Sequence, residues 1–180
     1  MLYTLWFACF ASFGWATRRH FRNHGVFTTG MKWTFCLGTF FSLLQLVAIA
    51  AQNQSKPAAI CYSLSLALFW WTVRTTRGKG FGACFTSIES LELVTTGPYR
   101  WIRHPFYTSY LLIWIAGAFL YPPLLTAFLT MGYIYWKAAV EEEDRFCKGP
   151  RGAAYDAYRR RTGRFFISLA SGSARPKAAA

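Results

Sequence analysis

Five apolar runs, separated by short polar connections, restrict what this chain can fold into more than any other feature. They cover residues 2–16, 33–51, 58–73, 106–121 and 124–136 of the 180. A helix needs about 20 residues to cross the apolar core of a bilayer, and only the second run approaches that length alone. The others need aromatic and basic residues at their ends to complete a crossing. The pattern predicts an all-α integral membrane protein with about five transmembrane helices.

The distribution of Lys and Arg predicts the orientation of these helices. Four basic residues lie in 17–32, five in 74–105 and ten from residue 137 onward, whereas 52–57 holds one. With five crossings, 19 of the 20 lie on one side, which the positive-inside rule makes cytoplasmic. We expect the N-terminus outside and the C-terminus in the cytoplasm, in a bacterial inner membrane or the endoplasmic reticulum. The alternative, in which one short run is re-entrant or peripheral, would break this segregation.

Composition narrows the class of protein further. The net charge of +13 would suit nucleic acid, but 54% of the residues are hydrophobic and only 15% are charged. We therefore expect membrane lipids rather than nucleic acid as the partner of the basic residues. The five cysteines show neither a CxxC pair nor a metal-binding spacing, so we expect unpaired thiols and no metal. The start of the chain lacks the basic region of a cleaved signal peptide.

The ionisable residues suited to catalysis, other than Lys and Arg, all lie on the predicted cytoplasmic side. All seven acidic residues and all three histidines are in the connections or the tail on that side. Pro122-Pro123 separates the last two apolar runs, which indicates a tight helical hairpin. This hairpin returns the chain to the interface where the fourth helix starts at Pro105. The segments "GPYRWIRHPFY" (97–107) and "EEED" (141–144) should therefore be neighbours.

The start of the fourth helix has the features of an anion-binding site. Its free N–H groups and positive dipole end suit a carboxylate or phosphate, and His104 and Arg103 lie beside it. At most two of the four acidic residues can face one pocket, because successive helical residues are 100° apart. Tyr155 and Tyr158 share a face of a predicted tail helix, which would cover the site as a lid. The alternative is an interfacial anchor, with arginines reaching headgroups and tyrosines forming an aromatic belt.

These segments together resemble the isoprenylcysteine carboxyl methyltransferase family. The resemblance rests on "LVTTGPYRWIRHPFY", an apolar hairpin, "EEEDRF" and "Y..Y..R.GRF", within residues 85–167. It implies one membrane-embedded methyltransferase domain over 1–167, followed by a flexible basic tail at 168–180. That family belongs to a wider group of membrane methyltransferases that includes the phospholipid N-methyltransferases. Its members use S-adenosylmethionine, bound in a cytoplasm-facing pocket, and act on lipophilic or lipidated substrates that enter from the bilayer.

Roles follow from this resemblance, position by position. Glu142, Glu143 and His104 are the predicted catalytic residues, and Lys137, Arg103 and Tyr158 are the predicted substrate contacts. The predicted cofactor contacts are Leu91, Glu92, Leu93, Val94, Tyr99, His104, Pro105, Phe106, Tyr107 and Glu142, with Glu143 as the alternative glutamate.

The sequence departs from the family pattern at three places. Phe146 stands where a leucine usually follows the acidic pair, and "CKGPRGAAY" is about one residue long for the usual spacing. An arginine often precedes the pair by one turn, near the substrate carboxylate; Ala138 or Ala139 stands there, and the nearest base is Lys137. An isoprenylcysteine-like carboxylate remains the primary expectation for the acceptor. A lipid amine or thiol is the alternative.

The chemistry needs few groups. A sulfonium methyl is already electrophilic, so transfer requires a nucleophile that is aligned and shielded from water. A carboxylate needs no base, whereas an amine or thiol loses a proton that His104 or a glutamate can accept. Two rival functions are an NADPH-dependent membrane reductase and a non-catalytic membrane scaffold. No dinucleotide-binding fingerprint occurs, since the glycines at 78–82 lack a strand and helix around them.

Overall fold

The computed structural model describes residues 1–21, 29–51, 55–79 and 93–168, and these ranges are helical throughout their length apart from short connections. They contain no strand, which confirms the all-α expectation. The α-helices are α1 (Leu2–Arg19), α2 (Thr29–Ala51), α3 (Lys56–Thr76), α4 (Pro105–Leu120), α5 (Leu125–Lys148) and α6 (Gly152–Arg161). Two short 3-10 helices, η1 (Gly97–Arg100) and η2 (Pro122–Leu124), lie before and after α4.

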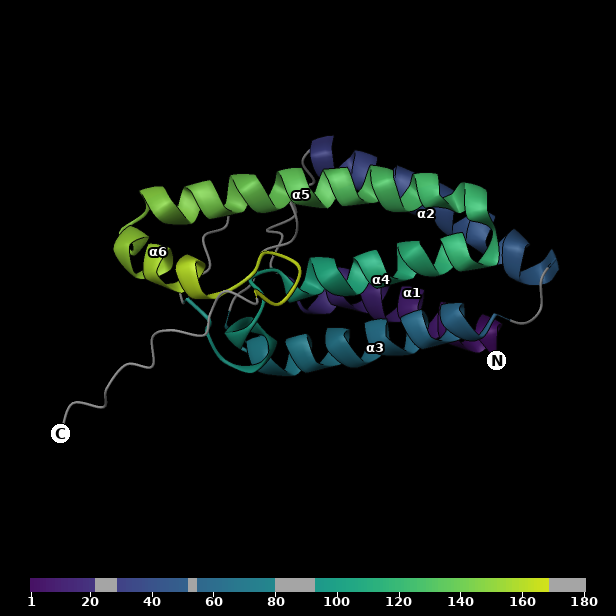
Figure 1. Cartoon of the computed structure of the whole chain (residues 1–180), viewed down its shortest axis with the longest axis horizontal. Coiled ribbons are helices and arrows are strands. Elements are labelled where there is room, and N and C mark those ends of the chain that lie inside the picture. The colour runs from purple at the N-terminus through teal and green to yellow at the C-terminus, as the bar shows by residue number, and fades with distance from the viewer. Residues whose placement is uncertain (22–28, 52–54, 80–92, 169–180) are drawn as a thin grey trace.

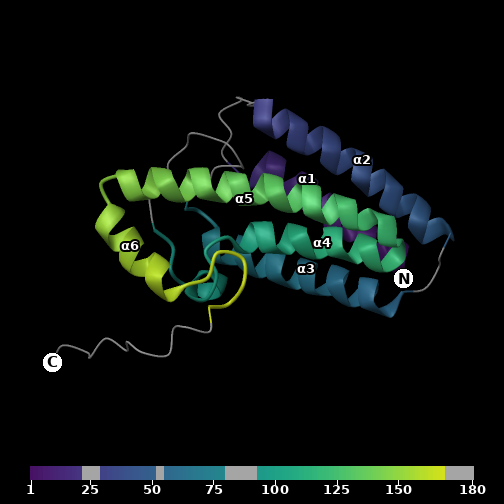
Figure 2. The same cartoon turned by 45° about the horizontal axis from the view of Figure 1, so that its top comes forward.

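Helices α1 to α5 form an elongated bundle in which consecutive helices run in opposite directions (Figures 1 and 2). Helix α4 lies in the middle and packs mainly against α3 and α5. Helix α6 turns back from the end of α5 and lies at the end of the bundle where α4 begins (Figure 1). The "RHP" segment, the acidic cluster and the tail helix are thus gathered at one end, as the predicted hairpin requires.

Local sequence signals explain where the helices begin and turn. The side chain of Ser55 caps α3 by accepting from the N–H of Ala58 at 3.3 Å. Proline occupies the first turn of α4, and Pro122 and Pro123 form the tight link to α5, so the helical hairpin is confirmed. Gly97 adopts φ +58°, and a Cβ there would collide with the Thr75 side chain. Glycine thereby lets the loop before α4 close against the end of α3.

Helix α5 is longer than its apolar run predicts. The run ends at residue 136, but the helix continues to Lys148. The acidic cluster therefore projects from a rigid helix rather than from a connecting segment. Its one-residue spacing on a helix also means that each acidic side chain points in a different direction.

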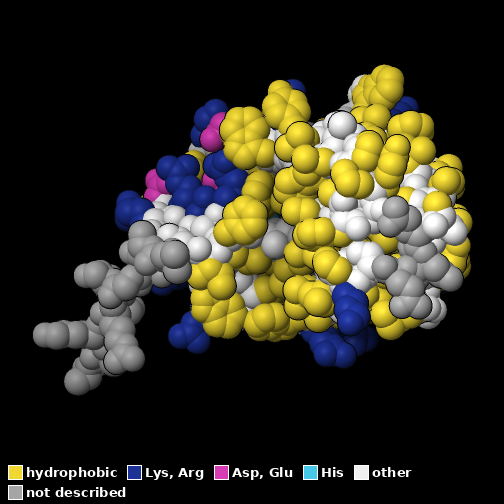
Figure 3. Space-filling model, turned by 45° about the vertical axis from the view of Figure 1, so that its right-hand side comes forward, with side chains coloured by type: hydrophobic (Ala, Val, Ile, Leu, Met, Phe, Trp, Pro, Cys, Tyr) yellow, Lys and Arg dark blue, Asp and Glu magenta, His cyan; other side chains and the backbone are white. Residues whose placement is uncertain are grey.

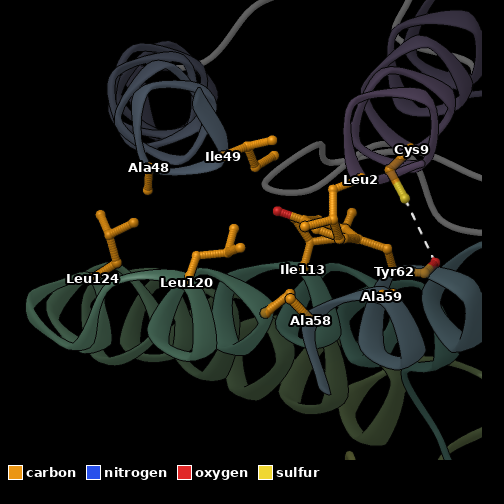
Figure 4. Close-up of a cluster of buried hydrophobic side chains, with 11 residues drawn as sticks. Leu2, Cys9, Ala48, Ile49, Ala58, Ala59, Tyr62, Ile113, Leu120 and Leu124 are labelled. Carbon is orange, nitrogen blue, oxygen red and sulfur yellow. Dashed lines mark hydrogen bonds between the residues drawn. The ribbon is translucent and has the colours of Figure 1, made fainter. Parts of the chain in front are cut away.

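The half of the bundle away from the acidic cluster is a packed apolar core. Small and large side chains from several helices interdigitate in it, among them Ala58, Ala59, Ile113 and Leu120 (Figure 4). The thiol of Cys9 donates to the carbonyl of Tyr62 at 3.6 Å. The four described cysteines are unpaired, as expected, and Cys84 lies outside the described residues.

One polar bridge crosses this core between three helices. Gln45 of α2 is fully buried, and its amide Nε2 donates to the carbonyl of Ile113 in α4 at 3.1 Å. Its Oε1 accepts from the hydroxyl of Tyr62 in α3 at 2.8 Å. Gly117 gives the amide room, because a Cβ there would lie 2.7 Å from Nε2. In an apolar surrounding such a bridge also fixes the register of the helices.

Replacing Gln45 by alanine is expected to lower the free energy of unfolding by about 1–2 kcal/mol, because two interhelical hydrogen bonds are lost and Tyr62 keeps an unpaired hydroxyl. The measurement is unfolding of the purified protein in mixed micelles with increasing denaturing detergent. Tyr62→Phe removes one bond without changing the packing, so its loss should be smaller. Equal stability of Gln45→Ala and the wild type would show that the bridge contributes nothing.

The outer surface of the bundle is strongly apolar. Exposed large side chains include Phe7, Trp33, Val47, Leu129 and Tyr133, each more than half accessible. Figure 3 shows apolar side chains over most of one face, with acidic side chains toward one end among Lys and Arg. Among the described residues α2 alone is both long and apolar enough to cross a membrane by itself, with a mean hydropathy of 1.9. A surface of this kind suits contact with lipid.

Candidate functional site

The candidate site begins where the C-terminal segment is bound to the start of α4. Backbone hydrogen bonds join Arg103 N–H to the Gly163 carbonyl at 2.8 Å, and His104 N–H to the Arg164 carbonyl at 3.1 Å. Gly163 N–H in turn donates to the Trp101 carbonyl at 3.1 Å. We call residues 162–165 the C-terminal clamp. This pairing, far apart in the sequence, fixes the backbone that carries His104.

Glu143 lies at the centre of a buried charge cluster beneath the clamp. Its side chain is 1% exposed. Oε1 accepts from Arg103 Nε at 2.9 Å, from His104 Nε2 at 3.1 Å and from Arg164 Nε at 3.0 Å. Oε2 accepts from Arg164 Nη2 at 3.0 Å, so that arginine binds the carboxylate with two parallel bonds. Glu143 is therefore the hub that joins α4, α5 and the clamp.

The ionisation of Glu143 follows from these partners. Burial by itself would raise the pKa of its carboxyl, but hydrogen bonds from His104, Arg164 and Arg103 outweigh burial and hold the pKa well below its ordinary range. An ionised carboxylate only accepts hydrogen bonds. The hydrogen between Glu143 and His104 must accordingly be on Nε2 of the imidazole. In the neutral ring, Nδ1 is then left with a lone pair.

Glu142, the preceding residue of α5, lies on the other side of the same imidazole. Its Oε2 is 3.7 Å from His104 Nδ1 and accepts from the Tyr107 hydroxyl at 3.4 Å. The Glu142 side chain is 37% exposed, in contrast to Glu143. The two adjacent glutamates thus contact different ring nitrogens of one histidine. Glu143 is enclosed by cations, whereas Glu142 is partly exposed.

Aromatic rings form a wall beside this pair. The rings of His104 and Tyr107 are nearly parallel, with centroids 5.4 Å apart, and Tyr107 is stacked in the same way on Tyr135 of α5 at 5.4 Å. Phe165 of the clamp lies 6.0 Å from His104 and 6.5 Å from Tyr107. The faces of such rings carry partial negative charge and attract cations. Together with Glu142 they make this part of the site suited to a positively charged group.

The structure brings together some of the predicted site residues and leaves others apart. His104, Tyr107, Glu142 and Glu143 form one cluster with Arg103, and Pro105 starts the helix beside it. Phe106 points into the bundle, with its ring 5.7 Å from Phe69. Val94 is buried and Leu93 partly so, whereas Leu91 and Glu92 lie outside the described residues.

The three predicted substrate contacts have other surroundings. Tyr158 and Arg103 are hydrogen-bonded to other groups of the protein, and Lys137 lies away from the cluster. The Tyr158 hydroxyl donates to the Tyr99 carbonyl at 2.7 Å, so α6 secures the loop before α4. The Arg103 guanidinium donates to Glu143 and, through Nη1, to the carbonyls of Arg159 and Thr162. Lys137 is exposed, and on an α-helix it lies about 140° around the axis from Glu142.

Sequence reasoning missed three residues of the site: Arg164, Phe165 and Tyr135. The first two were quoted only as part of the "GRF" pattern and received no role. Tyr135 precedes Glu142 by seven residues, a spacing that puts both on one stripe of α5. That spacing would have identified it once the acidic cluster was known to continue the helix.

The fold and this site define a helical protein with an apolar exterior and one polar centre at the end of its bundle. The family model of the isoprenylcysteine carboxyl methyltransferase (ICMT) family matches residues 58–147, which is half of the chain. The chain belongs to this family, whose members are methyltransferases integral to membranes. The match runs from α3 into α5 and ends before the clamp. Comparisons with curated proteins and with solved structures gave no match.

Proposed function

We propose that the protein transfers a methyl group from S-adenosylmethionine to a lipophilic acceptor at the cytoplasmic face of a membrane. The observation that carries this proposal is the imidazole of His104 held between two glutamates, of which Glu143 is enclosed and Glu142 is partly exposed. Family membership supplies the reaction class. The family resemblance favours a carboxylate as acceptor.

The proposed membrane placement has α1 to α5 as the five crossings. Two observations support it. The exterior of the bundle is apolar, and the start of α4, the end of α5 and helix α6 lie at the same end of the bundle (Figures 1 and 2). The basic residues of the corresponding connections make that end cytoplasmic by the positive-inside rule. The N-terminus is then outside, and α6 and the clamp lie at the cytoplasmic interface.

The residues present fit a sulfonium cofactor that carries an ammonium group. Glu142 supplies a partly exposed carboxylate, and the partly buried ring of Phe165, which lies 6.5 Å from Tyr107, supplies an aromatic face that attracts cations. S-adenosylmethionine, when bound, provides the activated methyl group. Glu143 and the clamp hold His104 in one orientation, and the aromatic wall limits the access of water. Orientation of this kind accounts for a large part of the rate of a bimolecular transfer.

The test is S-adenosylmethionine binding by calorimetry on the detergent-purified full-length protein. The wild type is expected to bind saturably, and His104→Ala with Glu142→Ala should lose binding, because the partly exposed carboxylate and the ring beside it are both removed. Glu141→Gln is the matched control, since this exposed residue has the same charge and lies one position away on another face of α5.

Absence of binding to a folded, monodisperse wild-type sample would contradict the proposal. Retention of binding by the double variant would place the cofactor elsewhere. An NADPH-dependent reductase would instead bind a dinucleotide phosphate. That reading gains no support from the described cations of the cluster, Arg103 and Arg164, because both are bonded to Glu143.

A further inference from the structure

We propose that Phe166 and Ile167, the two residues after the C-terminal clamp, insert into the cytoplasmic leaflet, and that Arg160 binds anionic phospholipid headgroups beside them. We call these three residues the bilayer anchor. The anchor holds the clamp against the start of α4. The inference rests on the proposed membrane placement, in which α6 and the clamp lie at the cytoplasmic interface.

Four exposed tryptophans mark the level of the cytoplasmic interface on the bundle. Trp15 of α1 and Trp70 of α3 have ring centroids 5.2 Å apart, and the rings of Trp71 and Trp101 are 5.7 Å apart. Each of the four side chains is more than one third accessible. Tryptophan is enriched where the apolar core of a bilayer meets the headgroups. The clamp begins at this level, because Gly163 N–H donates to the carbonyl of Trp101.

From that level the clamp runs along the first turn of α4, in the same direction as the helix (Figures 1 and 2). The carbonyl of Arg164 accepts from His104 N–H at 3.1 Å, and the carbonyl of Phe165 accepts from the Thr108 hydroxyl at 3.0 Å. Thr108 lies three residues into α4, about 4.5 Å along its axis. Phe166 therefore follows at the depth of the first turn of a membrane-crossing helix.

The two side chains at this depth are apolar and widely exposed. Phe166 is 74% and Ile167 is 64% accessible, whereas Phe165, one residue earlier, is partly buried beside His104. Exposure of two adjacent large apolar side chains to water is unfavourable, whereas the acyl chains of a leaflet surround them without this penalty. Their place beside the first turn of α4 favours lipid as the partner.

The last turn of α6 supplies the cationic part of the anchor. Arg160 is exposed and makes no ion pair with another described residue. Arg159, by contrast, lies 3.8 Å from Asp156, the one acidic residue of α6, and the Arg161 guanidinium lies over the ring of Tyr158. An anionic leaflet attracts basic residues near its surface. The charge that complements its headgroups is therefore placed where α6 ends and the clamp begins.

The test is amide hydrogen exchange of the full-length protein in nanodiscs that hold one copy each. Discs of phosphatidylcholine are compared with discs that also contain phosphatidylglycerol, and exchange is measured on peptides that cover residues 160–168. S-adenosylmethionine is left out. We expect the anionic lipid to slow exchange of the wild-type clamp by about fivefold, the factor implied by the attraction of one basic residue to an anionic leaflet.

Two variants separate the charge from the apolar insertion. Arg160→Gln should lose the dependence on phosphatidylglycerol, whereas Lys148→Gln, which removes the exposed cation at the end of α5, should keep it. Phe166→Ser should exchange faster in both lipids by about tenfold, the order expected when one large apolar side chain is no longer buried in lipid. Phe119→Ser makes the same change at an exposed residue near the other end of α4 and should leave the clamp unaffected.

Each outcome either supports the anchor or overturns it. Equal exchange of the wild type in the two lipids would overturn the role of Arg160, and wild-type exchange in Phe166→Ser would overturn insertion. The same protection from inorganic phosphate in phosphatidylcholine discs would assign the arginine to a free anion. Protection that appears only in discs with two copies would assign the apolar pair to a second copy of the chain. Because no cofactor is used, failure to bind S-adenosylmethionine would overturn the proposed function alone.

Discussion

Replacing Glu143 by alanine is expected to lower the free energy of unfolding by about 3–5 kcal/mol, because removal of one partner leaves buried charges uncompensated. Glu143 is 1% exposed and Arg103 only 9%, so water cannot solvate what remains. Two bonds from Arg164 and one from His104 are lost in the same step. The measurement is unfolding in mixed micelles, and Asp144→Ala, an exposed neighbour in the acidic cluster, is the control.

Glu143→Gln separates charge from shape in this prediction. The wild-type carboxyl has its pKa lowered from an ordinary value of 4.5 by the surrounding donors, in spite of burial. A group with a lowered folded-state pKa stabilises the fold above its unfolded pKa, and this contribution is lost as the pH falls toward the folded value. The advantage of the wild type over Glu143→Gln should therefore be full at neutral pH and shrink below pH 4.5. An advantage that is constant down to pH 3 would contradict ionisation of Glu143 as its source.

The helices of this protein were predictable because burial in lipid and burial in a bundle both require apolar runs. Each of the five runs became a helix, and the prolines at 105, 122 and 123 marked the hairpin correctly. The end of α5 was not predictable in this way. Beyond residue 136 it is amphipathic rather than apolar, so hydropathy ends while backbone hydrogen bonding continues.

The site was predictable as a set of residues but not as an arrangement. The hairpin implied that "RHP" and the acidic cluster would meet, and helical geometry limited the pocket to two glutamates. Which glutamate is enclosed depends on Arg164, and Arg164 reaches it only because Gly163 pairs with residues about 60 positions earlier. A parallel bridge between Ile102 and Gly163 has no local sequence signal. Pairings of this kind are decided by tertiary packing.

The enclosure of Glu143 also changes its predicted role. Both glutamates were expected to act in catalysis, and that assignment stays a prediction for Glu142. Glu143 has its Oε1 bonded to three donors and its Oε2 to one, so it is suited to hold His104 rather than to take a proton from an acceptor. Its action on the reaction would then pass through the imidazole. The backbone that carries both partners is fixed by the clamp.

Gly163→Ala is expected to reduce methyl transfer by about 100-fold, because the clamp sets the position of His104 and a displacement near 1 Å has an effect of this order. A Cβ at residue 163 would collide with the carbonyl of Phe166 and lie 3.1 Å from the Ser168 nitrogen. Both are backbone atoms, so the segment itself must move. That movement strains the bonds from Gly163 to Arg103 and Trp101 and shifts Arg164 relative to Glu143.

The matched control for this change is Gly14→Ala in α1, where a Cβ would meet nothing within 4 Å. It makes the same chemical substitution and should retain the rate of the wild type. The rate is measured with labelled S-adenosylmethionine in nanodiscs, beside calorimetric binding of the cofactor. Because Gly163 touches neither glutamate directly, a misplaced His104 should appear as a slower transfer at saturating cofactor. A wild-type rate in Gly163→Ala would mean that the C-terminal clamp covers the site without positioning it.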